Sequence, residues 1–528
     1  MTSRIYLFAF LSCIYVMPVH GQDLDVSLIQ TRAELSDYRE TTRYNEVMGF
    51  LEAVVLASEE LHLTSFGYTT EGRSLPLLVY GDVWDASSEE AIQTGKTRVF
   101  IQANIHAGEV CGKEALLILI RKLADGEHAQ WADSLVVLIA PVYNTDGNER
   151  ISLYNRPRQH GPIGGMGQRP NAQGLDLNRD HMKLDSPEAR SLVKLIHEYN
   201  PHVLIDLHTT NGTIHGYHLT YSPPLNPNTA EPIIDLLRNQ WLPEVRKRIK
   251  TTYDWDFYYY GNVPRPGGSR ERGWYTFDHR PRFNNNYVGL RNRIAILSEA
   301  YSYATFEDRI KATLYFVEEN LNYAYEHASA IQQLIEEVDL QTIVGQTLAV
   351  RSTHKRSPEP IPVLMGEVVE ERNPYTGEVM LRREDTRTPE QMYEFGTFQP
   401  TESETAPKTY FIPPTMTTVI ERINAHGIWV EALSEPRELV LETFRIDSTH
   451  VADRPFQGRQ ERTLFGAYET ITTILPAGTM IVPVDQSLGR LVFYLLEPRS
   501  DDGLVNWALM DDVLDGVQYY PILREPAQ

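Results

Sequence analysis

The stretch RVFIQANIHAGEV, residues 98–110, joins an apolar run to a polar turn. The run is short, apolar and followed by polar residues, which is typical of a buried strand. His106 and Glu109 come next, with two residues between them. An imidazole and a carboxylate in one turn can bind a metal ion, but so short a pattern also occurs by chance in solvated loops. The remainder of the chain has to separate these two interpretations.

Similar apolar runs recur up to about residue 300 and alternate with segments of helical periodicity. The predicted strands are Leu75–Tyr80, Val99–Ala103, Leu135–Ala140, Val203–Leu207 and Ile294–Leu297. The predicted helices are Tyr44–Leu61, Glu114–Leu123, Pro187–Glu198 and Phe306–Tyr325. Strands that alternate with helices predict an α/β fold, with a doubly wound, mainly parallel mixed sheet and helices on both faces. In such sheets, ligands bind beyond the carboxyl ends of the strands.

Polar residues stand at or just beyond the ends of these apolar runs. They are His106 with Glu109, Asn144 with Asp146, Asp206 with His208, and Glu299. Because ligands of doubly wound sheets bind outside the carboxyl ends of the strands, we expect these side chains to reach one common rim.

Two long segments lack helical periodicity. Asn155–Asp180 is rich in glycine and proline, and a loop of that length inside a compact domain is usually a binding element. Trp255–Tyr287 is rich in aromatic residues. This second loop either lines a pocket or packs on its own domain.

Beyond about Ile335 the alternation of strands and helices gives way to short strand-like runs, which suggests a second domain. Short strand-like runs are Val363–Glu370, Glu438–Ile446, Met480–Val484 and Arg490–Leu496, with one predicted helix at Thr417–Ala425. The runs are separated by proline, glycine and charged turns. We therefore predict a catalytic domain over residues 22–335 and a smaller, mostly β domain of unknown role over residues 336–528.

The first residues predict export. A basic start, Met1–Arg4, precedes an apolar segment, Ile5–Met17, and small residues at Val19 and Gly21. This pattern is typical of a secretory signal that is cleaved after Gly21, so residues 1–21 are expected to leave a periplasmic or secreted protein. No later segment is apolar over the roughly 18 residues that a membrane-spanning helix needs.

The composition and net charge of the chain disfavour some classes of binding partner. The chain has 528 residues and a net charge of −22, without a lysine or arginine run. This disfavours nucleic acid and anionic membranes as partners, and no protein partner can be inferred. Cys13 would leave with the signal, so the mature chain keeps only Cys111 and has no intrachain disulfide.

The strand-end residues fit a catalytic zinc ion, which typically has three protein ligands and keeps one position for water. His106, Glu109 and His208 would form such a set. Imidazole ligands usually donate their second N–H to a carboxylate, for which Asp176 or Asp206 is available. Glu299, at the end of the last apolar run, could then act as the base for the water.

These residues resemble the M14 family of zinc metallocarboxypeptidases, the carboxypeptidase A type. The resemblance extends over about Tyr44–Tyr325 and rests on six motifs in family order. They are TEGR at 70–73, HAGE at 106–109, NTDG at 144–147, GLDLNR at 174–179, DLH at 206–208 and LSE at 297–299. Each motif is weak alone, but their shared order and spacing are specific.

The resemblance implies a peptidase that releases C-terminal residues with one zinc ion per chain. His106, Glu109 and His208 would bind the zinc, with Asp176 holding His106. By position, Asn178 and Arg179 would bind the terminal carboxylate of the substrate, and Glu299 would be the general base. The family's oxyanion-stabilising arginine corresponds best to Arg158, with Arg156 as the alternative.

Two features depart from the family pattern. The interval before His208 is shorter than in the digestive enzymes, which suggests trimmed loops and a more open cleft. The family's mobile, carboxylate-capping tyrosine has no secure counterpart, because neither Tyr275 nor Tyr287 has convincing spacing to Glu299. Side-chain specificity therefore cannot be read from the sequence.

Three alternatives remain open at this stage. An N-acyl amino acid deacylase resembling aspartoacylase would share the DLHTT and DLNR motifs, although its relatives are intracellular. A peptidase for peptidoglycan stem peptides would share the fold and suit an exported protein. A binding protein without catalysis would be expected to lose a ligand or the base, whereas all four residues are present.

Overall fold

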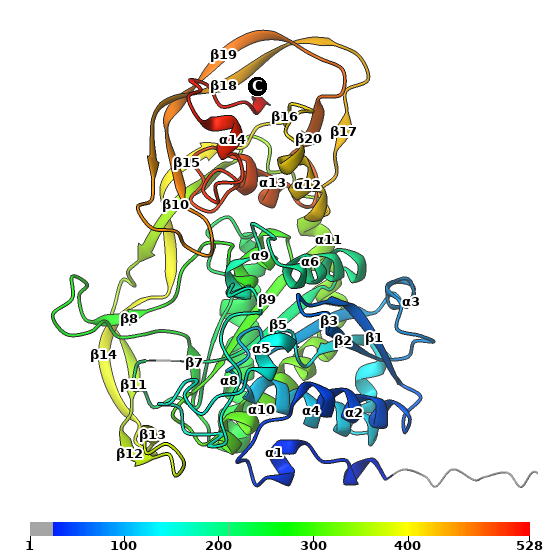
Figure 1. The fold of residues 1–528 in the computed structure, drawn as a ribbon, viewed down its shortest axis with the longest axis vertical. Coiled ribbons are helices and arrows are strands. Elements are labelled where there is room, and N and C mark those ends of the chain that lie inside the picture. The colour runs from blue at the N-terminus through cyan, green and yellow to red at the C-terminus, as the bar shows by residue number, and fades with distance from the viewer. Residues whose placement is uncertain (1–24, 211, 528) are drawn as a thin grey trace, which may run out of the picture.

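The computed structural model describes residues 25–210 and 212–527. The predicted signal, residues 1–21, lies outside the described residues. Figure 1 shows an α/β part formed by the N-terminal two thirds of the chain and a largely β part formed by the rest. Most of the β part stands above the α/β part in this view, while the strands of residues 361–395 lie along its left side.

The lower part is built on an eight-stranded mixed sheet. In spatial order its strands are β1 (Leu61–Tyr68), β2 (Ser74–Tyr80), β4 (Leu135–Ala140), β3 (Thr97–Ala103), β5 (Val203–Thr209), β9 (Ile294–Ala300), β6 (Leu219–Ser222) and β7 (Phe257–Tyr259). Neighbours from β4 to β9 run parallel, as do β6 and β7, whereas the pairs β1–β2, β2–β4 and β9–β6 are antiparallel. The predicted doubly wound, mainly parallel mixed sheet is therefore confirmed.

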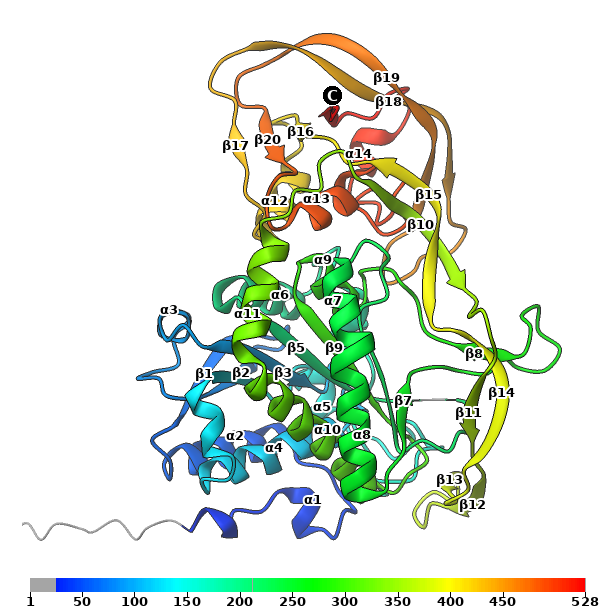
Figure 2. The ribbon, with the colours of Figure 1, turned by 180° about the vertical axis from the view of Figure 1, so that it is seen from behind.

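Helices cover both faces of this sheet, as predicted (Figure 2). One face packs against α2 (Tyr44–Val55), α4 (Cys111–Ala124), α7 (Glu231–Asp235), α8 (Leu242–Tyr253), α10 (Phe306–Glu326) and α11 (Ala328–Asp339). The other packs against α3 (Ser88–Gln93), α6 (Pro187–Tyr199) and α9 (Asn284–Leu290). The strands alternate accordingly: Val99 and Ile101 of β3 join the first apolar cluster and Phe100 joins the second.

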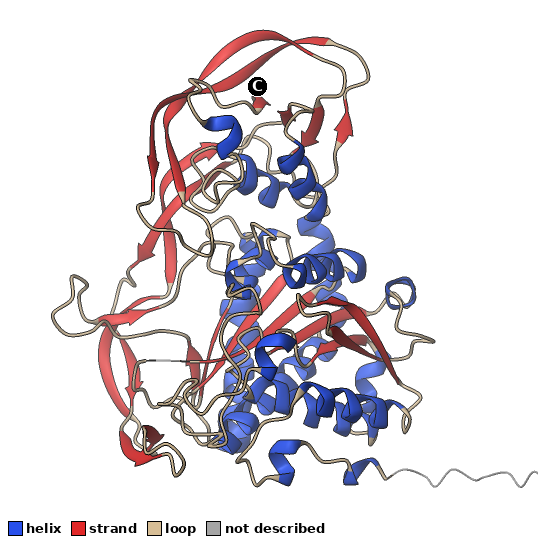
Figure 3. Cartoon of the chain, in the orientation of Figure 1, coloured by secondary structure: helices blue, strands red, loops and turns tan. Residues whose placement is uncertain are grey.

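Strands predominate in the C-terminal part, whereas helices flank the sheet below it (Figure 3). The C-terminal strands are β10 (Thr347–Lys355), β11 (Ile361–Met365), β12 (Val368–Arg372), β13 (Val379–Arg383), β14 (Thr388–Phe395), β15 (Thr397–Thr405), β16 (Thr409–Ile412), β17 (Glu431–Ala432), β18 (Arg437–Val451), β19 (Arg462–Leu475), β20 (Met480–Pro483) and β21 (Leu523–Glu525). Its helices are α12 (Thr417–Ala425), α13 (Gly489–Leu496) and α14 (Asp511–Leu514). The predicted mostly β region is confirmed.

Three elements differ from the sequence prediction. The predicted helix Tyr44–Leu61 ends at Val55, and Leu61 begins strand β1. Arg490–Leu496, predicted as a strand, lies in helix α13, whose residues are all buried; so short an apolar run fits a strand as well as a helix. Val363–Glu370 divides between strands β11 and β12. The expected boundary at residue 335 falls inside helix α11, which continues to Asp339.

The two parts of the chain are joined by a shared core and a shared sheet. Buried residues of α6 and α9 belong to the same apolar cluster as Leu491, Phe493 and Trp507 of the C-terminal part. In addition, β8 (Gly273–Tyr275) pairs in parallel with β14. Within the described residues, no helix combines the length and apolarity needed to cross a bilayer.

Candidate metal centre and active site

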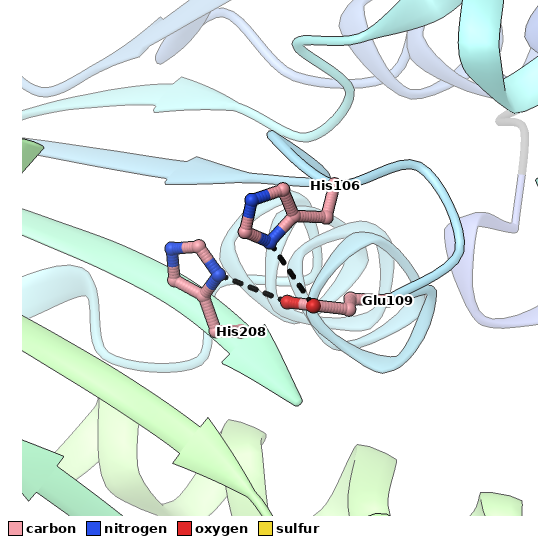
Figure 4. A group of neighbouring side chains, drawn as sticks. All are labelled: His106, Glu109 and His208. Atoms are coloured by element: carbon pink, nitrogen blue, oxygen red, sulfur yellow. Dashed lines mark hydrogen bonds and ion pairs between the residues drawn. The ribbon is translucent and has the colours of Figure 1, made fainter. Parts of the chain in front are cut away.

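Three side chains converge where strands β3 and β5 end. The Nδ1 atom of His106 lies 3.0 Å from Glu109 Oε1, and the Nδ1 atom of His208 lies 2.9 Å from Glu109 Oε2. Figure 4 shows both imidazoles turned toward the same carboxylate. One ligand atom from each residue lies within 4.8 Å of the others, and all three residues are buried. The predicted strand-end residues thus form one compact donor set.

Local backbone structure produces this convergence. Strand β3 ends at Ala103, and Asn104 takes a left-handed conformation with φ of 67° that turns the chain away from the sheet. The amide N–H of Glu109 then donates to the His106 carbonyl oxygen at 2.8 Å, which closes the turn before α4 begins at Cys111. His208 arrives separately, near the end of β5.

Both imidazoles are fixed from behind by carboxylates. His106 Nε2 lies 3.0 Å from Asp176 Oδ1, and His208 Nε2 lies 2.9 Å from Asp206 Oδ2. Asp176 and Asp206, the two aspartates expected from the sequence, therefore hold one histidine each. A carboxylate on the second nitrogen is the usual partner of a metal-binding histidine, because it fixes the ring and its tautomer.

The charges around the triad favour ionised carboxylates. Burial opposes ionisation of Glu109, but Arg156 and His106 outweigh it and hold the pKa of this carboxyl well below its usual range. Burial also opposes the charged form of His208, yet Asp206 and Glu109 raise the pKa of its imidazole well above the usual value. These carboxylates keep a proton on His208, and a bound metal cation would displace it.

The donor set fits the metal that the sequence suggests. Two imidazole nitrogens and one carboxylate oxygen form the ligand set of one class of catalytic zinc sites. Here all three donors are buried, close together and held by further hydrogen bonds, including one of 3.0 Å from the Thr209 amide to Glu109 Oε2.

Glu299 lies beside this set because of strand register. It pairs with His208 across the parallel strands β9 and β5. Its Oε2 atom is buried and accepts no hydrogen bond from the described residues. Burial raises the pKa of its carboxyl to about 8, with His208 opposing the shift and Glu109 adding to it. A carboxylate in this environment can accept a proton from a neighbouring group at near-neutral pH.

The triad and Glu299 share a cavity with a volume of about 240 Å³. Asn178 and Arg179, predicted to bind a carboxylate, also line it. The guanidinium carbon of Arg179 sits 3.8 Å from the ring centre of Phe283, and burial lowers the pKa of Arg179 to about 10. Asn178 Oδ1 accepts from the amide of Asn284 at 2.8 Å. Both residues come from the end of the predicted Asn155–Asp180 loop.

Of the two arginines that the sequence offered, the alternative, Arg156, contacts the triad, whereas Arg158 does not. Arg158 does not line this cavity and lies instead in a neighbouring one. Arg169 lines the cavity and donates to Asp176 Oδ2 from Nε at 3.0 Å and from Nη2 at 2.8 Å. Arg156 donates to Glu109 Oε1 at 2.6 Å. The loop has no periodicity, so its sequence gives no means of finding which of its arginines turns inward.

Neither of the two tyrosines with unconvincing spacing lines the cavity. Tyr275 stacks on Phe395, and Tyr287 is fully buried and hydrogen-bonded to His426. Tyr260, from the same aromatic segment, lines the cavity and accepts a hydrogen bond of 2.8 Å from Asn262. Burial raises the pKa of the Tyr260 phenol.

Asn144 and Asp146 do not join the cavity, although they follow strand β4. Asn144 Oδ1 caps the short helix α5 (Thr145–Glu149) by accepting from the Gly147 amide at 2.9 Å. Asp146 accepts from Thr69 and Arg73, each at 2.7 Å. These motif residues therefore tie together the loops around the site.

Comparison with known proteins decides the family. The family model described as "Zinc carboxypeptidase", peptidase M14, matches residues 48–337. The chain belongs to this zinc carboxypeptidase family. As a member it is a metallocarboxypeptidase, a hydrolase that acts on peptides, and the predicted resemblance is confirmed.

Curated relatives carry carboxypeptidase names as well. "Carboxypeptidase 2" of Trichophyton rubrum is 24% identical over 507 residues, which cover 92% of this chain and 86% of that protein. "Carboxypeptidase E" of Caenorhabditis elegans is 34% identical over 130 residues, or 24% of this chain and 26% of that protein.

Solved structures of metallocarboxypeptidases are similar over about half of the chain. A metallo-carboxypeptidase from Burkholderia cenocepacia matches with a TM-score of 0.41 and 20% identity, covering 54% of this chain and 69% of that chain. The carboxypeptidase A from Helicoverpa armigera matches with a TM-score of 0.41 and 17% identity, covering 55% and 75%.

Proposed function

We propose that this zinc carboxypeptidase releases single C-terminal residues from peptides, with one zinc ion held by His106, Glu109 and His208. The observation that carries the proposal is the convergence of these three donors, with a carboxylate behind each imidazole and Glu299 beside them. A zinc ion bound there would act as a Lewis acid and lower the pKa of water.

Glu299 is the proposed general base. Glu299 lines the cavity, one of its oxygens has no hydrogen-bond partner among the described residues, and its raised pKa suits a group that takes a proton and gives it back near neutral pH. In this role the carboxylate accepts a proton from the attacking water and then donates it to the departing amine. Both transfers need only one carboxyl group within reach of the cleaved bond.

Arg169 and Arg179 are the proposed partners of two groups of the substrate, the carbonyl under attack and the terminal carboxylate. Arg169 lines the cavity next to Glu109, where its guanidinium can donate to the oxygen of the carbonyl under attack. Arg179 presents a planar fork that pairs with a carboxylate through two hydrogen bonds, and Asn178 adds a further polar group. Asp176 and Asp206 orient the two histidines.

A matched pair of substrates tests exopeptidase action. We expect Arg179→Ala to lower kcat/KM on a peptide with a free C-terminal carboxylate by about 10- to 100-fold, because a hydrogen bond to a charged group contributes about 1.5–3 kcal/mol. The same peptide with an amidated C-terminus lacks that partner and should be a poor substrate for both enzymes. Equal loss on both peptides would argue against recognition of the terminal carboxylate.

The dependence of activity on zinc is tested with the wild-type protein. Purified protein should contain about one zinc per chain, lose turnover with a chelator and recover it with added zinc. Protein that is free of zinc and fully active after chelation would contradict the proposal.

We also propose that residues 1–21 are a cleaved secretory signal and that the enzyme works in the periplasm or outside the cell. Support comes from the basic start, the apolar segment and the small residues before Gln22. N-terminal sequencing of protein from the exported fraction should begin at Gln22. Full-length protein that is retained in the cytosol would contradict export.

A further inference from the structure

A second cavity, of about 610 Å³, adjoins the cavity of the metal triad and shares Arg169 with it. Four of its nine lining residues are arginines and none is acidic, although the whole chain has a net charge of −22. The arginines are Arg156, Arg158, Arg169 and Arg265. The arginines place positive charge beside the active site of a protein that is acidic as a whole. This local positive charge would attract anions.

A third cavity, of about 860 Å³, continues from the second and shares Arg158 and Arg265 with it. It adds Arg272, together with Met365 of β11 and Leu381 of β13. Strand β11 belongs to the same three-stranded sheet as β8, with β14 between them, and Figures 1 and 2 show this sheet and β13 on the same side of the molecule. We call these two cavities the arginine groove; the C-terminal part of the chain supplies one of its walls.

Three of the five arginines already have carboxylate partners. Arg156 donates to Glu109, Arg169 to Asp176, and Arg272 to Glu390. Arg158 and Arg265 are both exposed, and across residues 25–210 and 212–527 neither side chain makes an ion pair or hydrogen bond. These two guanidinium groups are therefore available to a ligand.

The direction of the groove follows from the proposed function, on which this inference rests. A carboxypeptidase has one residue beyond the cleaved bond, and Arg179 would hold its carboxylate in the cavity of about 240 Å³. That volume is below the roughly 300 Å³ at which ligand pockets usually begin, so the remainder of the peptide must lie outside it. The groove shares Arg169 with this cavity but not Arg179, and is thus the path for the upstream residues.

We propose that the arginine groove selects peptides with aspartate or glutamate side chains upstream of the cleaved bond, and that Arg158 and Arg265 determine this preference. A planar guanidinium pairs with a carboxylate through two donors, which favours acidic over other polar side chains. Solvent-exposed ion pairs are weak, so each arginine should contribute about 1.5- to 5-fold. Both together should give about 2- to 25-fold.

The test compares three peptides that end in the same free C-terminal residue. Upstream of it they carry three glutamates, three lysines or three alanines. For the wild type we expect kcat/KM to be highest on the glutamate peptide, and the advantage over the lysine peptide to shrink at high salt. The double variant Arg158→Glu/Arg265→Glu should reverse the order of the glutamate and lysine peptides.

Arg437→Glu is the matched control. Arg437 is also exposed and without an ion pair among the described residues, but it lies at the start of β18 and not in the groove. It should leave the ratio between the two peptides as in the wild type. A wild-type ratio at or below one, or a ratio that the double variant does not change, overturns the proposal.

A binding measurement separates this inference from the proposed function. If none of the three peptides, including the alanine peptide, is hydrolysed, the proposed function fails. Fluorescence anisotropy with labelled, C-terminally amidated glutamate and lysine peptides still reports on the groove. Tighter binding of the glutamate probe to wild type, lost in the double variant, supports the groove, and equal binding of both probes overturns it.

Discussion

Glu299 and His208 occupy paired positions on two parallel strands, and this register brings a carboxylate to the metal triad without any loop. The partner strand also fixes the approach of His208, because Asp206 lies two residues earlier on the same face of β5. The proposed base and one proposed ligand are thus held by sheet hydrogen bonds, which give more precise positions than loops do.

The role of Glu299 can be tested by removing only its charge. Glu299→Gln keeps the shape of the side chain but cannot accept a proton, so kcat should fall by about 10²- to 10⁴-fold. Zinc content should stay at the wild-type level, because Glu299 is not among the three donors. Turnover and metal analysis on the same preparation check this. Near-normal kcat would exclude Glu299 as the base, and loss of zinc would make it a ligand.

Metal affinity should depend on pH through His208. In the metal-free site its pKa is raised well above the usual value by Asp206 and Glu109, so the imidazole holds a proton at neutral pH. Zinc needs the neutral ring, and binding must therefore release this proton. The dissociation constant should rise as pH falls, by about tenfold per pH unit for one displaced proton. Calorimetry in buffers of different ionisation enthalpy counts the protons; an affinity independent of pH would contradict this account.

At the level of single residues, the sequence was informative where function coincides with a strand end. His106, Glu109, His208 and Glu299 follow apolar runs, so their meeting could be expected from topology. Which arginine faces the triad could not be predicted in this way. Arg158 and Arg169 lie in one aperiodic loop, and only the folded structure shows that Arg169 turns toward the triad.

Among the elements, those with a clear hydrophobic pattern were predicted close to their observed bounds. The predicted Pro187–Glu198 is helix α6, which has a strong apolar stripe, and Thr417–Ala425 coincides with α12. Helix α13 was missed because all its residues are buried, which leaves a short apolar run that fits a strand equally well.

The β18–β19 hairpin is an element whose role no sequence pattern indicated. Its tip turns at Gln457, which has a φ of 51°, and Gln457 Oε1 accepts from the backbone N–H of Asp176 at 2.7 Å. Arg459 of the same tip donates to Asp185 at 2.7 Å from both Nε and Nη2. Figure 1 shows the hairpin descending from the C-terminal part to the catalytic part. A segment about 280 residues away thus holds the backbone of Asp176, whose carboxylate holds His106.

Loss of this support should weaken metal binding modestly. Gln457→Ala removes one neutral hydrogen bond, so we expect zinc affinity to fall a few-fold, less than the about 10- to 100-fold typical when a carboxylate behind a ligand is lost. Gln460→Ala is the control, because Gln460 is in the same tip but, among the described residues, its side chain hydrogen-bonds only to Ala452. Competition with a chromophoric chelator measures both. Equal affinities for the two variants would show that Gln457 does not position Asp176.

For the whole molecule, the shared apolar cluster indicates that the two parts of the chain do not fold independently. Helices α6 and α9 pack into the same cluster as α13, and β14 extends the sheet of β8. Contacts between distant segments leave no local pattern in the sequence. The sequence could therefore suggest a change to short strand-like runs near residue 335, but not that the two parts share a core and a sheet.

Truncation tests this dependence. A chain that ends after Asp339 would expose the apolar residues that α13 and its neighbours cover, and exposed patches of this kind cause aggregation. We expect it to be insoluble or to bind a hydrophobic dye, in contrast to the full chain. A soluble, monomeric truncated protein with a cooperative thermal transition would show that the catalytic part folds alone.

The central claim, removal of one C-terminal residue at the His106, Glu109 and His208 site, is tested most directly by mass spectrometry of the products. The zinc-loaded enzyme is incubated with a peptide that has a blocked N-terminus and a free C-terminus. The account predicts a first product that is shorter by one residue, and no product with the His208→Ala variant. An internal cut, or cleavage that persists in His208→Ala, would contradict it.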